Sequence, residues 1–562
     1  MPRPLLPLCL AVAMGLPALA ADGPPYFDKS RSTDEQAEAA EEAAEEARGA
    51  DAAKALRLLG DPSAAVRDAV FAALVERKDD ALLGELRGAL RHENPLVRAS
   101  VAELFGLCRY EEGRAPLEKL GLRARDEATV LESIWALEAI GSAKSAKALA
   151  KLARKGHKAS AFRAAGDALL ALVKVDAEEA EELASKSLEG RSGAQRIAAV
   201  EALGRLDPKK GAEAACAVLS AAPLEGREEA WQPALERAAL ATLARWRSRS
   251  DEPALAKRAV EAVLATYERS GGLTAHLCWR ALVSATGESL GGAQDWRDWW
   301  ALKGKEFKAR DLAQEPEPRD DDDDEGGKKK KKDKKGKKKK GKKGKKKSDD
   351  EDEAQGAGGR VETGGASATK VRFCGVPVFS RRLLFLQDTS GGMSRHPVDE
   401  DDSESPLRIV YSMERLCEVL GQLDGEARVN VLFFATRYRS LSDRLVPLGK
   451  FREKLIGYVR KECKTPSGKG MTRSNLYDAL VFALDDPGID SVFFLSEGGQ
   501  TEGRYVGEER LLRHLERLNV YRRVRVNCLQ VTKKKKRARF LRELSQRTGG
   551  SYYPRSFLLS GD

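Results

Sequence analysis

The 562-residue chain has little histidine, few aromatic residues and no closely paired cysteines. With only five His, we do not expect a histidine-built catalytic or metal centre. The eight Cys are widely spaced and include no C-x-x-C pair, which argues against a zinc site and against a dense disulfide framework. One disulfide within the C-terminal part is left open. After the N-terminus, no apolar run is long enough to span a bilayer.

Motifs of several common enzyme classes are also missing. There is no G-x-S-x-G elbow, no P-loop, no H-E-x-x-H and no G-x-G-x-x-G after a predicted strand. His396 and His514 have no partner that the sequence identifies, and we expect both on the surface. The chain is therefore predicted not to be an enzyme.

What the chain does have is enough hydrophobic content, 42%, and enough length for several packed domains. The formal charge of +11 is not spread evenly. Sixteen Lys lie between Lys328 and Lys347, with acidic runs at Asp320–Glu325 and Asp349–Glu353 on either side. No predicted folded part is strongly basic, so nucleic acid is not an expected partner.

The first twenty residues have the features of an export signal. Arg3 precedes a short apolar stretch, and Ala18-Leu19-Ala20 forms a small-residue cleavage site. This predicts a protein exported to the periplasm or cell surface, or secreted, with no transmembrane segment after cleavage. An uncleaved anchor is the alternative. Residues 21–50 then form an acidic, Ala/Glu-rich helical lead-in, which we expect to be a surface helix.

Residues 51–310 contain an internal repeat. The sequence DPSAAVR at 61–67 recurs as NPLVR at 94–98, and weaker copies place Val130, Phe162 and Gln195 at the same point. Apolar residues at three- and four-residue spacing follow each copy, as in packed helices. This pattern resembles HEAT-type repeats and predicts an all-α solenoid of stacked helix pairs. An irregular helical domain is the alternative.

Residues 311–368 form a low-complexity, Asp/Lys-rich linker with almost no apolar content. Such a segment cannot bury enough surface to fold, so we expect a disordered tether. Its Lys block could bind an anionic envelope polymer, although the flanking acidic runs can neutralise it. A solubilising spacer is the alternative.

Residues 369–562 alternate between apolar strands and amphipathic helices. Continuous apolar strands between helices predict a mostly parallel sheet covered on both faces. The expected strands are Arg382–Gln387, Ala427–Ala435, Ser491–Ser496, Val524–Val531 and Ser551–Tyr553; the expected helices are Pro406–Leu420, Lys450–Lys461, Ser474–Leu484, Glu508–Leu518 and Lys535–Arg547.

Carboxylates follow two of these strands directly. Asp388 follows the first core strand and Glu497 follows the strand Ser491–Ser496. In parallel sheets, ligands bind beyond the carboxyl ends of strands, near the point where strand order reverses. Carboxylate and hydroxyl oxygens at that edge could hold a hard cation. An acid/base pair of an enzyme is a weaker alternative, because the sequence gives no sign of a substrate pocket.

Four ordered segments in this region share a resemblance. FLQDTSGGM, SNLYDAL, FLSEGGQTEG and RELSQRTGGSYY resemble the motifs of von Willebrand factor A (VWA) domains, over about Cys374 to Ser556. The resemblance implies an α/β, doubly wound, Rossmann-like fold with a metal-ion-dependent adhesion site.

The resemblance also implies a ligand set for that site, in degenerate form. Asp388 and Ser390 are retained, and Gly392 replaces a second Ser. Ser474 stands where a Thr is usual, with Thr472 as the alternative, and Glu497 replaces an Asp. Such a set would bind Mg²⁺ or Mn²⁺; the alternative is that Asp388 caps the sheet structurally.

The features together predict an exported, non-enzymatic scaffold or adhesion-type protein. We expect the solenoid and the VWA-like module each to bind a protein partner, and the module's binding could depend on a divalent cation. The alternative is an envelope-anchoring protein whose Lys-rich tract binds anionic surface polymers.

Overall fold

The computed structural model describes residues 33–155, 162–246, 249–308, 371–399, 404–464 and 473–559. The predicted export signal, the linker at 311–368 and Thr472 lie outside these ranges, and the predictions made for them stay predictions.

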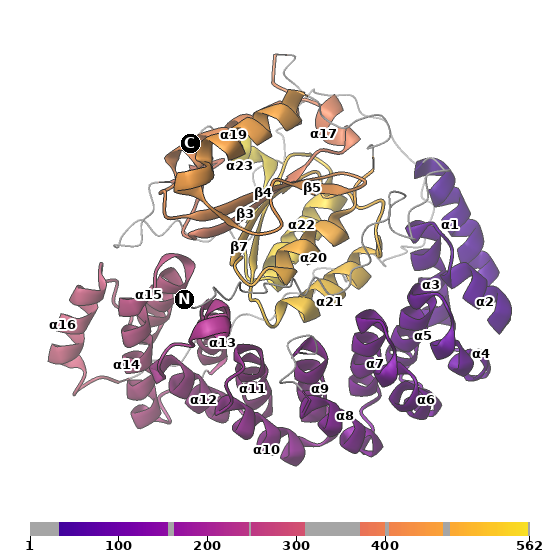
Figure 1. Ribbon diagram of the computed structural model, residues 1–562, viewed down its shortest axis with the longest axis horizontal. Coiled ribbons are helices and arrows are strands. Elements are labelled where there is room, and N and C mark those ends of the chain that lie inside the picture. Colours follow the sequence, from indigo (N-terminus) through magenta and orange to yellow (C-terminus); the bar gives the residue numbers. More distant parts are fainter. Residues whose placement is uncertain are drawn as a thin grey trace, which may run out of the picture.

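The N-terminal half is a helical solenoid that curves around the C-terminal half (Figure 1). Helices alternate between the concave and the convex side, and each packs on its neighbours along the curve. On the concave side are α3 (Ala64–Arg77), α5 (Pro95–Leu107), α7 (Glu127–Ile140), α9 (Phe162–Val175), α11 (Gly193–Leu206), α13 (Gln232–Arg245) and α15 (Gly272–Thr286). The other helices are α2 (Ala52–Leu59), α4 (Asp80–Leu86), α6 (Arg114–Lys119), α8 (Ala146–Ala153), α10 (Ala177–Leu188), α12 (Pro208–Ser220) and α14 (Pro253–Arg269).

The two clearest copies of the sequence motif make the turns that enter α3 and α5. In the first copy, the Arg67 guanidinium donates to the Asp61 and Pro62 carbonyls, at 2.7 and 3.0 Å. In the second copy, Arg98 donates to the carbonyls at the same offsets, those of His92 and Glu93, at 2.5 and 2.8 Å. The motif arginine therefore donates hydrogen bonds to carbonyls of the turn that accept none from within a helix, and this explains why the arginine recurs.

Both ends of the solenoid are closed by additional helices. At the start, α1 (Thr33–Arg48) packs on α3 and buries Ala43 and Ala47. The acidic lead-in helix is therefore exposed on one side and buried against α3 on the other. At the far end, Trp296 of α16 (Ala293–Lys303) is buried beside Trp299.

The C-terminal half is built on a seven-stranded sheet in the order β5-β4-β3-β7-β8-β9, with β6 paired to β4. The strands β4, β3, β7, β8 and β9 are neighbours in this order, and each neighbouring pair among them is parallel. The short strands β5 and β6 both pair antiparallel with β4. The strands are β3 (Arg382–Asp388), β4 (Arg428–Phe434), β5 (Tyr438–Ser440), β6 (Val446–Pro447), β7 (Ser491–Ser496), β8 (Arg525–Gln530) and β9 (Tyr552–Tyr553). A separate hairpin, β1 (Arg372–Phe373) and β2 (Val376–Pro377), precedes them.

Helices cover both faces of this sheet. Leu383 and Phe385 of β3 belong to a core shared with α18 (Arg408–Gln422) and α19 (Leu448–Lys464). Leu384 and Leu386 point to the opposite face, where α20 (Leu476–Asp485), α21 (Glu508–Asn519) and α22 (Lys535–Arg547) lie. Two short helices, α17 (Gly391–Arg395) and α23 (Arg555–Leu559), complete the domain.

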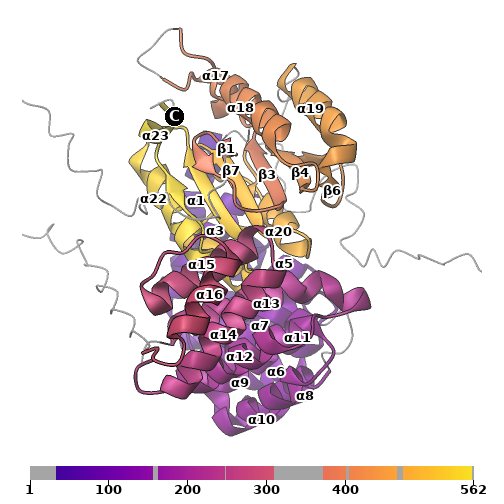
Figure 2. The same ribbon diagram turned by 90° about the vertical axis from the view of Figure 1, so that its left-hand side faces the viewer.

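The α/β domain sits against the concave side of the solenoid. In Figure 2, α18 and α19 lie on the side of the sheet away from the solenoid. Residues on the near face, from Leu384 to Leu544, form one continuous hydrophobic core with solenoid residues from Ala43 onwards. Two parts that the linker separates by many residues are thus packed as one body.

No helix in the described part of the chain is long and apolar enough to cross a membrane. Each cysteine side chain that the structure describes is a free thiol, namely Cys108, Cys216, Cys278, Cys374, Cys417 and Cys528.

Candidate functional site

Asp388 ends β3 at the edge where strand order reverses. β3 pairs with β4 on one side and with β7 on the other, so residues that follow β3 and β7 converge there. The buried Asp388 carboxylate accepts hydrogen bonds from the Ser390 N–H (2.8 Å) and the Ser496 hydroxyl (2.7 Å). Burial raises the pKa of Asp388 to about 6 because it disfavours the charged form.

Glu497 follows β7, and its carboxylate is paired with the Arg408 guanidinium. Arg408 begins α18, is only 1% exposed, and also donates to the Pro397 carbonyl at 3.1 Å. The Glu497 carboxylate lies over Gly392, where a Cβ would be 2.5 Å from its Cδ. The glycine and the glutamate are therefore matched: a side chain at 392 would displace the carboxylate.

Ser474 lies in the loop before α20, beside the loop that follows β7. Its carbonyl accepts from the N–H groups of Thr501 (2.9 Å) and Glu502 (3.0 Å), and its own N–H donates to the Thr501 hydroxyl. The buried Ser474 hydroxyl has no hydrogen-bond partner among the described residues. Ser474 thus holds two loops together through its backbone.

The structure brings Asp388, Ser390 and Ser496 into contact, and places Glu497 over Gly392 beside them. In this arrangement the residues do not fit a divalent cation. The Asp388 oxygens are already engaged, and the positive charge next to Glu497 is supplied by Arg408. The described residues contain no group of three His, Cys, Asp or Glu placed to hold a metal ion. Binding of Mg²⁺ or Mn²⁺ stays a prediction, and it would require Glu497 to leave Arg408.

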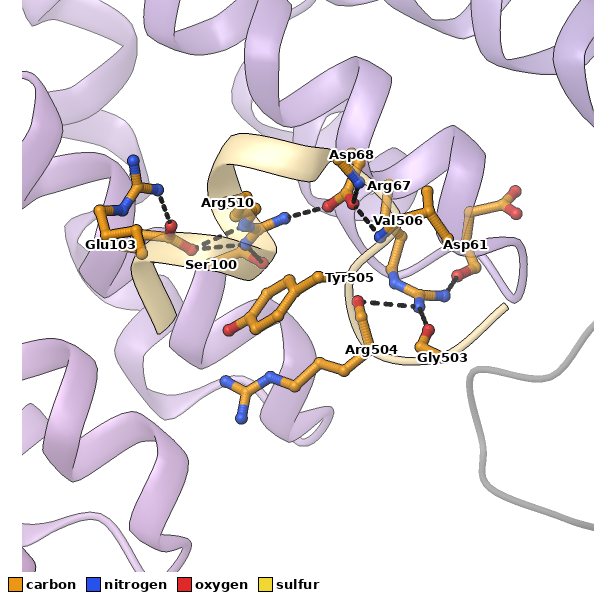
Figure 3. Close-up of polar contacts among 12 residues, drawn as sticks. Asp61, Arg67, Asp68, Ser100, Glu103, Gly503, Arg504, Tyr505, Val506 and Arg510 are labelled. Atoms are coloured by element: carbon orange, nitrogen blue, oxygen red, sulfur yellow. Dashed lines mark hydrogen bonds and ion pairs between the residues drawn. The ribbon is translucent and has the colours of Figure 1, made fainter. Parts of the chain in front are cut away.

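The loop after β7 connects this edge to the solenoid (Figure 3). The Asp68 carboxylate of α3 accepts from the N–H groups of Val506 (2.6 Å) and Gly507 (2.7 Å). Arg67, the motif arginine, also donates to the Gly503 carbonyl at 3.1 Å. A loop that begins with Glu497 therefore ends on the first concave helix of the solenoid.

Arg510 of α21 lies at the centre of this contact. Its guanidinium donates to Asp68 (2.6 Å), Glu103 (2.8 Å) and Ser100 (3.0 Å), and lies 3.8 Å from the Phe71 ring centroid. Burial alone would raise the pKa of Glu103, but Arg510 and Arg513 hold it below its usual value. The fully paired cluster stabilises the docked arrangement.

The contact continues along the concave side as a row of arginine–carboxylate pairs. Arg513 bonds to Glu103 at 2.5 Å, Arg517 bonds to Glu138 at 3.1 Å, and Arg523 pairs with Glu201. The arginines of α21 recur three and four residues apart, and their partners lie on successive concave helices. The spacing of Arg510, Arg513 and Arg517 was visible in the sequence, but their partners lie hundreds of residues away.

His514 was expected on the surface, and this prediction is wrong. It is 6% exposed, bonds to the Tyr477 hydroxyl at 3.1 Å and packs edge-on against Trp135 of α7. Burial, together with the nearby arginines Arg504 and Arg510, lowers the pKa of His514 well below its usual value. The face of α21 that contains His514 is covered by the solenoid. His396, in contrast, is exposed as expected.

Comparison with known proteins supports the repeat part of the prediction. Residues 84–169 match a family model described as HEAT repeats. No curated protein matches the chain.

Several solved structures are similar to parts of the chain. A mutant form of the PilB minor pilin from Streptococcus sanguinis is 14% identical, with a TM-score of 0.26, over 32% of this chain and 58% of that one. An aerotolerance-related membrane protein from Bacteroides fragilis NCTC 9343 is 11% identical, with a TM-score of 0.23, over 32% and 95%. The complex of CpcE and CpcF of phycocyanin lyase from Nostoc sp. PCC7120 is 19% identical, with a TM-score of 0.25, over 42% and 94%. Similarity at these levels carries no argument about function.

Proposed function

We propose that this chain is a non-enzymatic, exported scaffold for protein–protein interaction. In this proposal, a VWA-like α/β domain binds a protein partner at the sheet edge that contains Asp388, and the HEAT-like solenoid holds that domain. The observation that carries the proposal is the docking of the domain in the solenoid by buried, paired charges such as Arg510 with Asp68 and Glu103.

The docked α/β domain limits which surface of the solenoid a partner can bind. Solenoids commonly bind through an extended concave surface. Here the α/β domain covers concave residues from Asp68 on α3 to Arg237 on α13. A partner of the solenoid would therefore bind its convex helices, and the sheet edge is the better candidate for the main binding surface.

The edge is accessible at several points. His396 is exposed, the Glu497 side chain is 17% exposed, and Gly391 and Gly392 are half-buried. The cation-dependent version of the proposal requires Glu497 to leave Arg408, and an acidic side chain of the partner would then complete the shell of Mg²⁺ or Mn²⁺. The cation-independent version uses Arg408 and Glu497 as they stand.

Site-specific crosslinking in the intact source cells tests the proposal. A photoreactive residue at His396 should give one discrete protein adduct, whereas the same residue at Arg297, exposed on α16, should not. The captured protein should then bind the purified full-length chain at one site by calorimetry. Absence of an adduct above the Arg297 control would contradict binding at this edge. Loss of binding in EDTA would support the cation-dependent version, and unchanged binding the other.

A further inference from the structure

A cavity of about 780 Å³ lies between the solenoid and the α/β domain, apart from the sheet edge described above. Concave helices α7 to α15 form one wall, and α21, the start of β8 and the turn after α22 form the other. Its volume is within the range of small-molecule sites. Exposed residues such as Arg280 and Glu516 on its lining give access from solvent.

The lining is strongly unbalanced in charge. Nine arginines line the cavity, against four carboxylates. One of these carboxylates, Glu201, is shared by Arg205, Arg245 and Arg523. Another, Asp167, uses its two oxygens for the Tyr521 hydroxyl and the Trp135 N–H, at 2.5 and 2.8 Å. Arg513 and Arg547 also pair with acids outside the lining, namely Glu103, Glu509 and Glu543. The positive excess therefore lies on the other arginines, around Arg237, Arg280 and Arg525.

Several guanidinium groups also retain unused donors. Arg237 is 3% exposed, and its Nε and Nη1 have no hydrogen-bond partner in the described residues. The nearest carboxylate to Nη1, that of Asp490, is 3.9 Å away. The buried Nε of Arg523 is likewise unbonded within the described chain. For Arg280, the described residues provide neither a hydrogen bond nor an ion pair.

Burial and the positive charges that crowd the cavity lower the pKa of some of the arginines that line it. Burial lowers the pKa of Arg523, and the neighbouring Arg245 and Arg205 lower it further. Burial and the nearby Arg280 lower the pKa of Arg525 to about 10. An unpaired buried cation is costly, so a site with this excess favours a bound anion.

We propose that this interdomain cavity binds a small, multiply charged anion of the oligophosphate class. Planar guanidinium groups donate in a fork that matches phosphate oxygens, and arginine is preferred where such groups are bound. Several arginines around one cavity suit a ligand with several phosphoryl groups better than one with a single charge. Because both halves of the chain line the cavity, the ligand would also reinforce their docking.

Calorimetry on the full-length chain with sodium tripolyphosphate tests the proposal at physiological ionic strength. We expect one saturable site. Arg280→Glu, at an exposed position with no described partner, should weaken binding by about tenfold or more, since it replaces an attractive charge with a repulsive one. Arg297→Glu on α16 is the matched control and should leave the affinity unchanged. Circular dichroism of each variant checks that it folds.

Three outcomes would overturn the proposal. Absence of saturable binding is the first. Equal affinity of the Arg280→Glu and wild-type chains is the second, because it would place the anion on the Lys tract, which both retain. The third is tighter binding of a peptide with the sequence of Asp320–Glu325, in competition with tripolyphosphate, which would make an acidic segment the occupant.

Discussion

Asp167 shows how a single side chain can join the two halves of the chain. It lies on α9, and its carboxylate accepts from Trp135 on the neighbouring helix and from Tyr521 of the α/β domain. Burial raises the pKa of Asp167 to about 6, although both hydrogen bonds favour the charged form. The folded state therefore holds a proton more tightly than the unfolded state, whose pKa is about 3.9.

This shift predicts a pH dependence. Between about pH 4 and pH 6 the folded state binds more protons at Asp167, so its contribution to stability falls as the pH rises, by up to about 2–3 kcal/mol. Asp167→Asn should remove this fall, although it should also lower stability at every pH because one of the two donors, the Trp135 N–H or the Tyr521 O–H, loses its oxygen acceptor. Chemical denaturation at about pH 4.5 and about pH 6.5 measures the difference. An unchanged pH slope in the variant would contradict the prediction.

The close packing of the Glu497 carboxylate on Gly392 leads to a second prediction about single residues. Gly392→Ser should destabilise the chain by about 1–3 kcal/mol, because the new Cβ meets the Glu497 carboxylate. Adding Glu497→Asp shortens that side chain and should recover part of the loss. A double-mutant cycle of unfolding free energies measures the coupling. Strictly additive effects would show that the two positions are independent.

At the scale of single elements, α9 is shaped to receive Tyr521, which lies in the turn between α21 and β8. Gly166 lies inside α9, and a Cβ there would be 2.7 Å from Cε1 of the Tyr521 ring. Glycine usually weakens a helix interior. Its presence here follows from the close approach of the α/β domain.

Gly166→Ala is therefore expected to destabilise the protein by about 1–3 kcal/mol, despite the better helix propensity of alanine. Gly457→Ala is the matched control. Gly457 lies inside α19 with no atom near its Cβ position, so this change should stabilise by about 0.5–1 kcal/mol. Thermal unfolding of the two variants gives opposite shifts if the explanation is right, and shifts of the same sign if it is wrong.

At the scale of the whole molecule, solenoid and α/β domain share one core and one buried polar network. The hydrophobic cluster runs from Ala43 to Leu544. Arg510, with Asp68 and Glu103, lies within it and is paired on every side. We expect the two halves to unfold together, since neither buries its contact surface alone.

Arg510→Met tests this expectation. It leaves the carboxylates of Asp68 and Glu103 buried without their main partner, which should cost about 3–5 kcal/mol and separate unfolding into two transitions. Replacing both carboxylates by Leu in the same chain should recover part of that loss. Arg297→Gln, which removes an exposed pair with Glu268, should change stability by less than about 1 kcal/mol. Denaturant titration followed by circular dichroism distinguishes one transition from two. A single unshifted transition for Arg510→Met would argue against a coupled fold.

Much of the secondary structure was predictable because it depends on local patterns. The core strands and most helices of the α/β half agree with their predicted ranges to within a few residues; β7 and α22 agree completely. The edge strands β5 and β6 and the helix α17 were missed, since they are too short for a periodic signal. At the candidate site, Asp388 and Glu497 were found from their positions after strands, but Arg408 was not. Nothing in the sequence indicates that an arginine at the start of a helix reaches a glutamate 89 residues away.

The helical repeats, the alternating strands and helices, and the edge of the sheet where polar residues gather could all be predicted from the sequence. Each of these depends on periodicity or on neighbours along the chain. Three features emerge only from the fold: the docking of the α/β domain on the concave side, the burial of His514, and the cavity rich in arginine between the halves. Those features depend on pairs such as Arg510 and Asp68, 442 residues apart. Side chains at such separations meet only in the assembled tertiary structure, and the sequence carries no local signal of their meeting.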